Sequence, residues 1–183
     1  ILERSTPDGR LLGLDTDPDA IRLAQNRLLA HRARAVLVVA NFADLGRVAA
    51  AHGFSPVDGI LFDLGVSSMQ LARAERGFSF QQEGPLDMRL DPSQHTTAAD
   101  LVNRLSAQEL ADIFYHYGEE RRARPLARAI VAAREREPIL TTGQLAAIVR
   151  RVVSWGSRGK RRIDPATRAF QALRIAVNRE LEN

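Results

Sequence analysis

Apolar residues occur in short unbroken runs over the first third of the chain. The runs at 11–15, 35–40 and 57–63 lack polar alternation, which is typical of strands buried on both faces of a parallel sheet. Between these runs, apolar positions recur at helical spacing over 18–28 and 44–53. The resulting β-α-β-α-β order predicts parallel strands joined by helical crossovers.

The hydrophobic pattern changes after about Gln70. Residues 71–96 contain glycines and prolines but no regular apolar period, which predicts a loop-rich stretch. Beyond it the apolar period is helical, and capping signals mark the helix starts. Ser106–Glu109 and Thr141–Gln144 have the sequence of capping boxes, and Asp164-Pro165 combines a cap with a helix-starting proline. The pattern therefore predicts the α/β fold class, with half of a sheet followed by a helical unit.

The charge is distributed unevenly along the chain. The 183 residues carry a net charge of +4, but residues 1–120 sum to −6 and residues 121–162 to +10. So basic a segment is typical of proteins that bind a polyanion. A solvated helical surface in an arginine-rich protein is the alternative. The absence of cysteine excludes disulfides and thiolate metal ligands and fits a reducing cytoplasm, and no apolar run has the roughly 20 residues of a membrane helix.

Polar or aromatic residues follow each apolar run, at the edge where open α/β sheets bind ligands. Asp15 can accept hydrogen bonds from both ribose hydroxyls of a nucleotide-type cofactor, or it can cap a helix. Phe42 can lie against an adenine ring, or it can belong to the core. Asp63 ends an all-apolar run and requires donors or water. Ser67 and Ser68 add hydroxyls at this rim, or cap the next segment. These residues predict an adenosine-type cofactor and leave NAD and S-adenosylmethionine open.

Four separated blocks of sequence carry a resemblance that decides between these cofactors. They are "GRLLGLDTDPDAI", "FDLGVSSMQL…RGFSFQQEGPLDMRLD", "YGEERRARPLARAI" and "PATRAFQALRIAVNRELE". Together they closely resemble the bacterial 16S rRNA cytosine-N4 methyltransferase family, over nearly the whole chain. The resemblance implies an incomplete class I, Rossmann-like methyltransferase sheet with an inserted α-helical domain. The implied domains are a cofactor-binding part over 1–70, a loop and helical insert for the RNA substrate over 71–163, and a helix over 164–183 leading back to the catalytic domain.

The same resemblance implies the chemistry and its residues. The family uses S-adenosylmethionine to methylate the exocyclic amine of a cytidine in 16S rRNA of the small ribosomal subunit, near the decoding centre. Cofactor contacts fall on Asp15, Phe42, Asp63 and Gln70. We hypothesise that the turn from Asp63 through Ser67 and Ser68 forms the junction between cofactor and acceptor amine, and we name these three as catalytic candidates.

Two further groups of residues are candidates for contact with RNA. The loop 76–91 is expected to act as a lid that offers Arg76, Phe78, Phe80, Asp87 and Arg89 to a base or a phosphate. The alternative is that the two phenylalanines only hold this loop against the core.

The second group is an arginine-rich tract. Its members are Arg158, Lys160, Arg161 and Arg162, with Trp155 close by, and we expect the tract to contact the RNA backbone.

Other classes of protein are less consistent with the sequence. His31, His52, His95 and His116 are scattered without metal-ligand spacing, so no metal site is expected. The remaining alternatives are a non-catalytic RNA-binding module and a fragment of an NAD-dependent dehydrogenase. Because the family's glycine-rich first motif and later strands are missing from the sequence, we expect this chain to be part of a longer protein.

Overall fold

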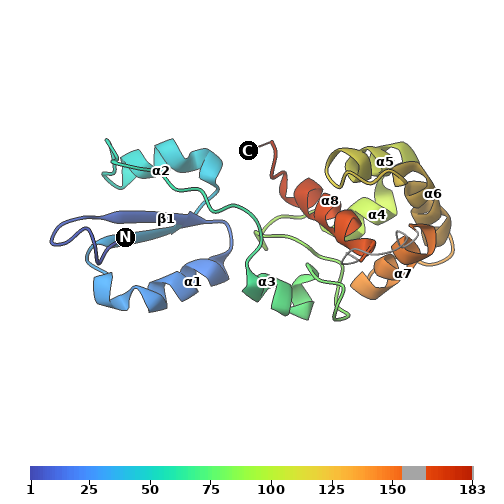
Figure 1. The fold of residues 1–183 in the computed structure, drawn as a ribbon, viewed down its shortest axis with the longest axis horizontal. Helices are drawn as coiled ribbons and strands as arrows, with labels where there is room; N and C mark the ends of the chain where they lie inside the picture. The colour runs from blue at the N-terminus through green and yellow to red at the C-terminus, as the bar shows by residue number, and fades with distance from the viewer. Residues whose placement is uncertain (154–163, 183) are drawn as a thin grey trace, which may run out of the picture. The chain divides into compact units, whose positions relative to one another are not determined.

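The computed structural model describes residues 1–153 and 164–182, and its chain forms two compact units (Figure 1). Unit 1 comprises residues 1–64 and 90–92, and unit 2 comprises residues 65–89 and 93–182. The observed class is α/β, with a small parallel sheet in unit 1 and helices in both units. The α/β prediction is therefore confirmed.

Unit 1 is built on two parallel strands, β1 (Leu11–Asp15) and β2 (Ala35–Val39). The register pairs Leu11 with Ala35 and Asp15 with Val39, so that both strands end at the same edge. α1 (Pro18–Arg27) connects the strands, and its Ile21 is buried. After β2 come a short 3-10 turn, η2 (Phe42–Asp44), and α2 (Leu45–Ala51), and Figure 1 shows α1 and α2 on opposite sides of the strands.

The prediction of a third strand over 57–63 is wrong. The sheet formed by the described residues has two strands, and residues 57–64 run as exposed chain in which Ile60, Leu61 and Phe62 are 60%, 81% and 55% exposed. An apolar run shows that side chains favour burial, but a strand also requires a neighbour for its backbone N–H and C=O groups. Here β1 pairs with β2, and no described segment pairs with 57–63.

Unit 2 is a bundle of helices around an apolar core. Its principal helices are α4 (Ala98–Arg104), α5 (Ala107–His116), α6 (Ala123–Arg134), α7 (Thr142–Val152) and α8 (Ala166–Asn178), and a short α3 (Ser68–Ala72) precedes them. α5 packs on both α6 and α8, and α6 packs on α7. Phe114, Ile130 and Leu173, from three of these helices, are completely buried, as a helix with one apolar face requires.

Capping residues define the helix starts that the sequence predicts. The Ser106 hydroxyl accepts a hydrogen bond from the Glu109 N–H, and the Glu109 carboxylate accepts one from the Ser106 N–H, which completes the capping box of α5. The same reciprocal pair joins Thr141 and Gln144 at the start of α7. Both predicted capping boxes are confirmed. None of the helices in the described part of the chain is long and apolar enough to cross a membrane.

The loop between α3 and α4 is fixed to the helical bundle rather than free. Pro85 forms an antiparallel bridge with Thr141, and the Leu86 N–H donates to the Leu140 carbonyl at 2.9 Å. The buried Thr142 hydroxyl accepts a hydrogen bond from the Gly84 N–H. The loop backbone is thus joined to the start of α7 on both sides of Pro85.

Candidate functional site

The carboxyl ends of β1 and β2 form the edge at which the sequence places its candidate cofactor residues. Asp15 is the last residue of β1, and its carbonyl accepts a hydrogen bond from the Ala40 N–H, directly after β2. Phe42 follows two residues later, after Asn41, whose side chain accepts from the Ala43 N–H and starts η2. The parallel register therefore brings Asp15 and the Phe42 turn to one edge of the sheet, as predicted.

The Asp15 carboxylate is held in a defined position. Its Oδ1 accepts a hydrogen bond from the Asp17 N–H at 2.8 Å, and the buried Asp17 in turn caps α1 by accepting from the Asp19 N–H. Partial desolvation and the nearby Asp17 charge raise the pKa of Asp15, and the backbone hydrogen bonds from Asp17 and Thr16 offset this only in part. Among the residues that the structure describes, no ion pair includes Asp15, so its carboxylate is suited to accept hydrogen bonds from neutral hydroxyl groups.

Phe42 also contacts the segment for which the third strand was predicted. Its ring lies edge-to-face against Phe62, with the ring centroids 6.1 Å apart. Asp63 is the next residue and is exposed. The aromatic contact therefore holds the Phe62-Asp63 segment near the turn after β2, although this segment is not a strand. Asp15, Phe42 and Asp63 belong to the same unit and follow three successive apolar runs.

Unit 2 begins with the glycine and serines that continue this segment. Gly65 has φ of +119°, a conformation that residues with a Cβ rarely adopt. Ser67 and Gln70 form the capping box of α3: the Gln70 N–H donates to Ser67 Oγ at 3.2 Å, and the Ser67 N–H donates to Gln70 Oε1 at 2.9 Å. Ser68 is the exposed first residue of that helix. The alternative that these serines cap the next segment therefore holds for Ser67, whose partner in the capping box is Gln70.

The aromatic residues of the predicted lid are packed into the helical bundle. Phe78 is 6% exposed, and Phe80 lies edge-to-face on Phe170 of α8 with the ring centroids 4.9 Å apart. The Arg150 guanidinium also lies over the Phe80 ring, 5.5 Å from its centre. These contacts favour the alternative in which the two phenylalanines hold the loop against the core.

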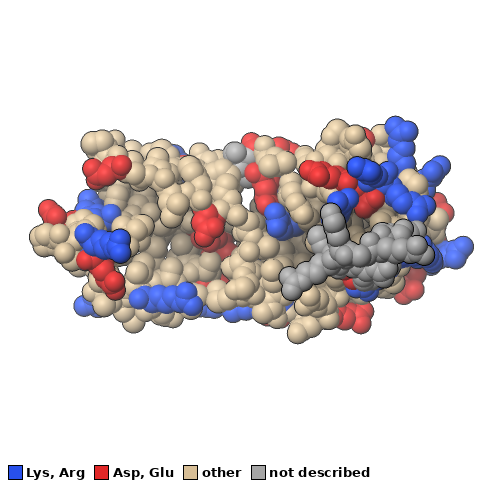
Figure 2. All heavy atoms as spheres, viewed as in Figure 1, with Lys and Arg blue, Asp and Glu red and all other residues tan. Residues whose placement is uncertain are grey.

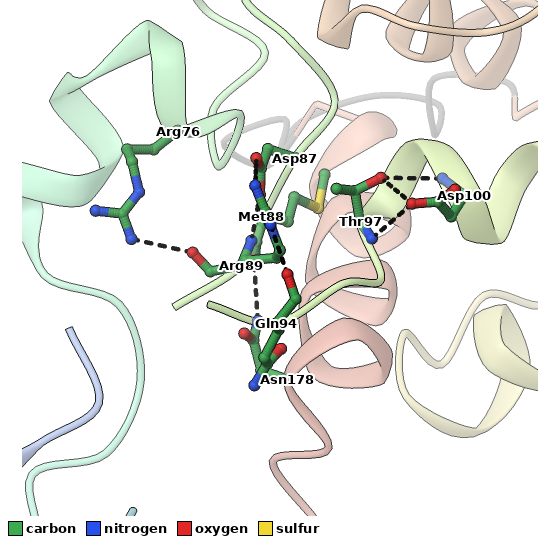
Figure 3. Close-up of polar contacts among 8 residues, drawn as sticks. All are labelled: Arg76, Asp87, Met88, Arg89, Gln94, Thr97, Asp100 and Asn178. Carbon is green, nitrogen blue, oxygen red and sulfur yellow. Dashed lines mark hydrogen bonds and ion pairs between the residues drawn. The ribbon is translucent and has the colours of Figure 1, made fainter. Parts of the chain in front are cut away.

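The two arginines of this loop belong to a network of polar contacts, drawn in Figure 3. The Arg89 guanidinium binds both oxygens of Asp87, at 2.8 and 2.7 Å, and also donates to the Gln94 carbonyl. Arg76 donates to the Arg89 carbonyl at 3.0 Å. Met88, between Asp87 and Arg89, has φ of +66°, and its carbonyl accepts a hydrogen bond from Asn178 at the end of α8.

The electrostatics of this network favour the ionised carboxylate. Burial alone would raise the pKa of Asp87, but the hydrogen bonds and charge of Arg89, together with the charge of Arg76, lower it below its ordinary value. Asp87 is therefore ionised at neutral pH. Arg89, paired with this carboxylate and bonded to the Gln94 carbonyl, helps to fix the conformation of the loop.

The remaining RNA candidates lie outside the described residues. They are Arg158, Lys160, Arg161 and Arg162, with the neighbouring Trp155.

Sequence reasoning missed one residue that fixes the loop. Asn178 is a buried amide on a mostly apolar helix, and this polar residue on an apolar face is the signal that could have identified it. Asp87 was expected to be available to a base or phosphate, but its pairing with Arg89 is recognisable only once the backbone between them is known.

A carboxylate at the end of one parallel strand, here Asp15, and an aromatic residue in the turn after the next strand, here Phe42, are typical of α/β proteins that bind a nucleotide-type cofactor. Comparison with known proteins shows to which family within this class the chain belongs. The chain belongs to the MraW methylase family, whose sequence profile matches residues 1–183. The family resemblance seen in the sequence is therefore confirmed.

Curated relatives agree with this assignment. The chain is 59% identical over 184 residues to a ribosomal RNA small subunit methyltransferase H of Thermomicrobium roseum, covering all of this chain and 55% of that protein. It is 52% identical to the protein of the same name from Syntrophobacter fumaroxidans and 55% identical to that of Syntrophotalea carbinolica, covering all of this chain and 57% and 58% of those proteins. The chain thus spans just over half the length of the curated relatives it matches.

Proposed function

We propose that the protein containing this chain transfers a methyl group from S-adenosylmethionine to the N4 amine of a cytidine in 16S rRNA, near the decoding centre. Membership of the MraW methylase family and relatives named as small-subunit rRNA methyltransferases support the reaction class and the substrate. The observation that carries the cofactor part is the shared edge of Asp15 and Phe42 at the ends of β1 and β2. Family membership disfavours the dehydrogenase alternative.

The residues at this edge fit the adenosine part of such a cofactor. Oδ1 of Asp15 accepts a hydrogen bond from the Asp17 N–H, and the second carboxylate oxygen can accept hydrogen bonds from the ribose hydroxyls. Phe42, held edge-on by Phe62, offers a rigid aromatic face for an adenine ring. We assign ribose recognition to Asp15 and adenine recognition to Phe42. Gln70, buried and fixed by Ser67, is our further candidate for a cofactor contact.

S-adenosylmethionine, when bound, supplies a methyl group activated by its sulfonium. The acceptor amine of cytosine is a poor nucleophile because its lone pair is delocalised into the ring. Catalysis therefore depends on positioning the amine and on stabilising the positive charge that develops on its nitrogen. Asp63 is our candidate for accepting an N–H of this amine, because it is an exposed carboxylate directly after the Phe62 contact. Ser67 and Ser68 are candidates for orienting the base.

The proposed RNA contacts differ in how they would act. Arg76 and Arg89 are engaged within the loop network, so we assign them the role of shaping the surface that a flipped-out base meets. Phe78 and Phe80 support the same loop from beneath. Arg158, Lys160, Arg161 and Arg162 remain candidates for contact with the RNA backbone.

The test is methyl transfer by the complete protein to small ribosomal subunits that lack the modification, followed by identification of the modified nucleoside by mass spectrometry. We expect N4-methylcytidine, and we expect Asp63→Ala to abolish its formation. Asp58→Ala is the matched control, because Asp58 is an exposed carboxylate in the same segment. Transfer to another nucleoside, binding of subunits without transfer, or wild-type turnover by Asp63→Ala would contradict the corresponding part of the proposal.

A further inference from the structure

α6 has one apolar face and one strongly basic face. Leu126, Ala127 and Ile130 are completely buried against the bundle, while Arg124 and Arg128 are exposed. These two arginines are four residues apart, so they lie one turn apart on the same side of the helix. Arg121, also exposed, lies in the turn that precedes the helix, three residues before Arg124. Figure 2 shows Lys and Arg side chains gathered over the part of unit 2 where α6 lies.

The arginines of this face form no ion pair with another described residue. None of the ion pairs among the residues that the structure describes includes Arg121, Arg124 or Arg128, and the first turn of α6 contains no acidic residue. Arg124 and Arg128 repel each other, and a cation in the first turn also opposes the helix dipole. The arrangement is thus unfavourable for the isolated helix and favourable for a negatively charged partner.

A groove between α6 and α7 adjoins this face. It has a volume of about 500 Å³, and Ala129, Ala132 and Ala133 of α6 line it with small side chains. Arg136, after α6, and Arg151, on α7, also line it. Glu137 is the acidic residue of the lining, so the charged residues there have a net charge of +1. The basic character of α6 therefore continues into the groove and onto α7.

We propose that Arg121, Arg124, Arg128, Arg136 and Arg151, which we call the α6 arginine surface, bind the phosphate backbone of an RNA strand. The guanidinium group matches phosphate oxygens in a bidentate manner, and all five positive groups here are arginines. The alanines leave room for a strand to approach the helix, and the two arginines that line the groove can meet its phosphates. The proposal rests on the proposed function, which supplies the RNA, and it names contact residues in addition to the candidates Arg158, Lys160, Arg161 and Arg162.

The experiment compares Arg124→Gln/Arg128→Gln with the wild-type complete protein. Binding of a 16S rRNA fragment is measured by fluorescence anisotropy over a range of salt concentrations. Each lost phosphate contact lowers the slope of log affinity against log salt by about 0.7 to 0.9, so we expect a decrease of about 1.5 for the double variant. Arg27→Gln/Arg32→Gln, which removes two exposed arginines from unit 1, is the charge-matched control and keeps the wild-type slope.

Methyl transfer to small subunits provides the second readout. We expect a KM increase of several-fold with unchanged kcat, because these arginines bind backbone and do not touch the reacting atoms. Arg151→Gln tests the surface from α7, independently of how well α6 folds in the double variant, and should lower the slope by about half as much.

The outcomes separate the two proposals. An unchanged salt slope in both variants, with normal methylation by the wild type, overturns the α6 arginine surface and leaves the proposed function intact. Unchanged RNA binding with loss of binding to RNA-free ribosomal proteins also overturns it, since the partner would then be protein. Failure of the wild type to methylate rRNA overturns the proposed function itself, whatever the variants bind.

Discussion

The Asn178 side chain donates a hydrogen bond of 2.8 Å to the carbonyl of Met88, a residue 90 positions earlier in the chain. The same amide nitrogen donates to the Arg174 carbonyl at 2.8 Å, so both of its hydrogens are used. Met88 has a left-handed backbone conformation and a side chain that is completely buried. One amide on α8 therefore holds the loop at the point where its backbone is least favourable for a residue with a Cβ (Figure 3).

Replacing this amide should destabilise unit 2. Asn178→Ala removes both hydrogen bonds and leaves the Met88 carbonyl without this donor, which costs about 1–3 kcal/mol. The measurement is the unfolding midpoint of the complete protein in urea. Asn26→Ala, an exposed position on α1, is the control and should change the stability by less than about 0.5 kcal/mol. Equal midpoints for the two variants would show that the Asn178 contact contributes nothing to stability.

The Asp87–Arg89 pair should make stability depend on pH in a defined direction. Because the pKa of Asp87 is lowered on folding, its contribution is complete above the unfolded pKa of about 3.9 and is lost as the pH falls through the folded value. Asp87→Asn should therefore be less stable than the wild type at pH 7, and the difference should shrink below about pH 4. Thermal unfolding at a series of pH values tests this, and a difference that is constant with pH would contradict it.

Two glycine-to-alanine substitutions should have opposite effects. A Cβ at Gly84 would overlap the Ala74 carbonyl oxygen, so Gly84→Ala should destabilise the protein by about 1–3 kcal/mol. A Cβ at Gly46, on α2, meets no atom within 4 Å. Gly46→Ala should therefore stabilise the protein by about 0.5 kcal/mol, because alanine favours the helix. The unfolding midpoints of the two variants are measured beside that of the wild type. A Gly84→Ala midpoint equal to or above that of Gly46→Ala would contradict the prediction.

Asp15→Asn should weaken cofactor binding without weakening the fold. A hydrogen bond to a charged acceptor contributes about 1.5–3 kcal/mol, so we expect about a tenfold or greater loss of S-adenosylmethionine affinity in equilibrium dialysis. The raised pKa of Asp15 adds a pH signature: wild-type affinity should begin to fall, as the pH decreases, at a higher pH than an ordinary aspartate would give.

Asp15→Asn is also the control for this pH dependence of cofactor affinity. The amide introduced by Asp15→Asn does not titrate, so the affinity of the variant should lack this fall with decreasing pH. Because burial raises the pKa of Asp15, its charge does not stabilise the fold, and the unfolding midpoint should be preserved. A binding defect accompanied by an equal loss of stability would indicate a structural role for Asp15 in place of ribose recognition.

Local signals in the sequence were sufficient for most elements. The apolar runs before Asp15 and Ala40 predicted two strands that are present, and the spacing from Thr141 to Gln144 predicted the start of α7. These signals succeed because a helix cap or a pair of adjacent parallel strands depends on residues close in the chain. The shared edge of Asp15 and Phe42 follows from the same two strands and could therefore be predicted.

Long-range contacts account for what the sequence did not reveal. The run at Ile60 to Phe62 had the composition of a buried strand, but composition does not reveal whether a neighbouring strand is present to pair with it. Phe78 gave no pattern that could distinguish a ring available to a base from one packed in the core. The loop that carries Phe78 is fixed in part by the bridge between Pro85 and Thr141, which are more than fifty residues apart.

The Asn178–Met88 contact also sets an order of events during synthesis. The loop around Met88 leaves the ribosome long before α8 exists, so it cannot acquire its final backbone from local sequence alone. Only the emergence of α8 supplies the donor that completes it. We therefore expect the loop that carries Asp87 and Arg89 to reach its final conformation only after α8 has been translated.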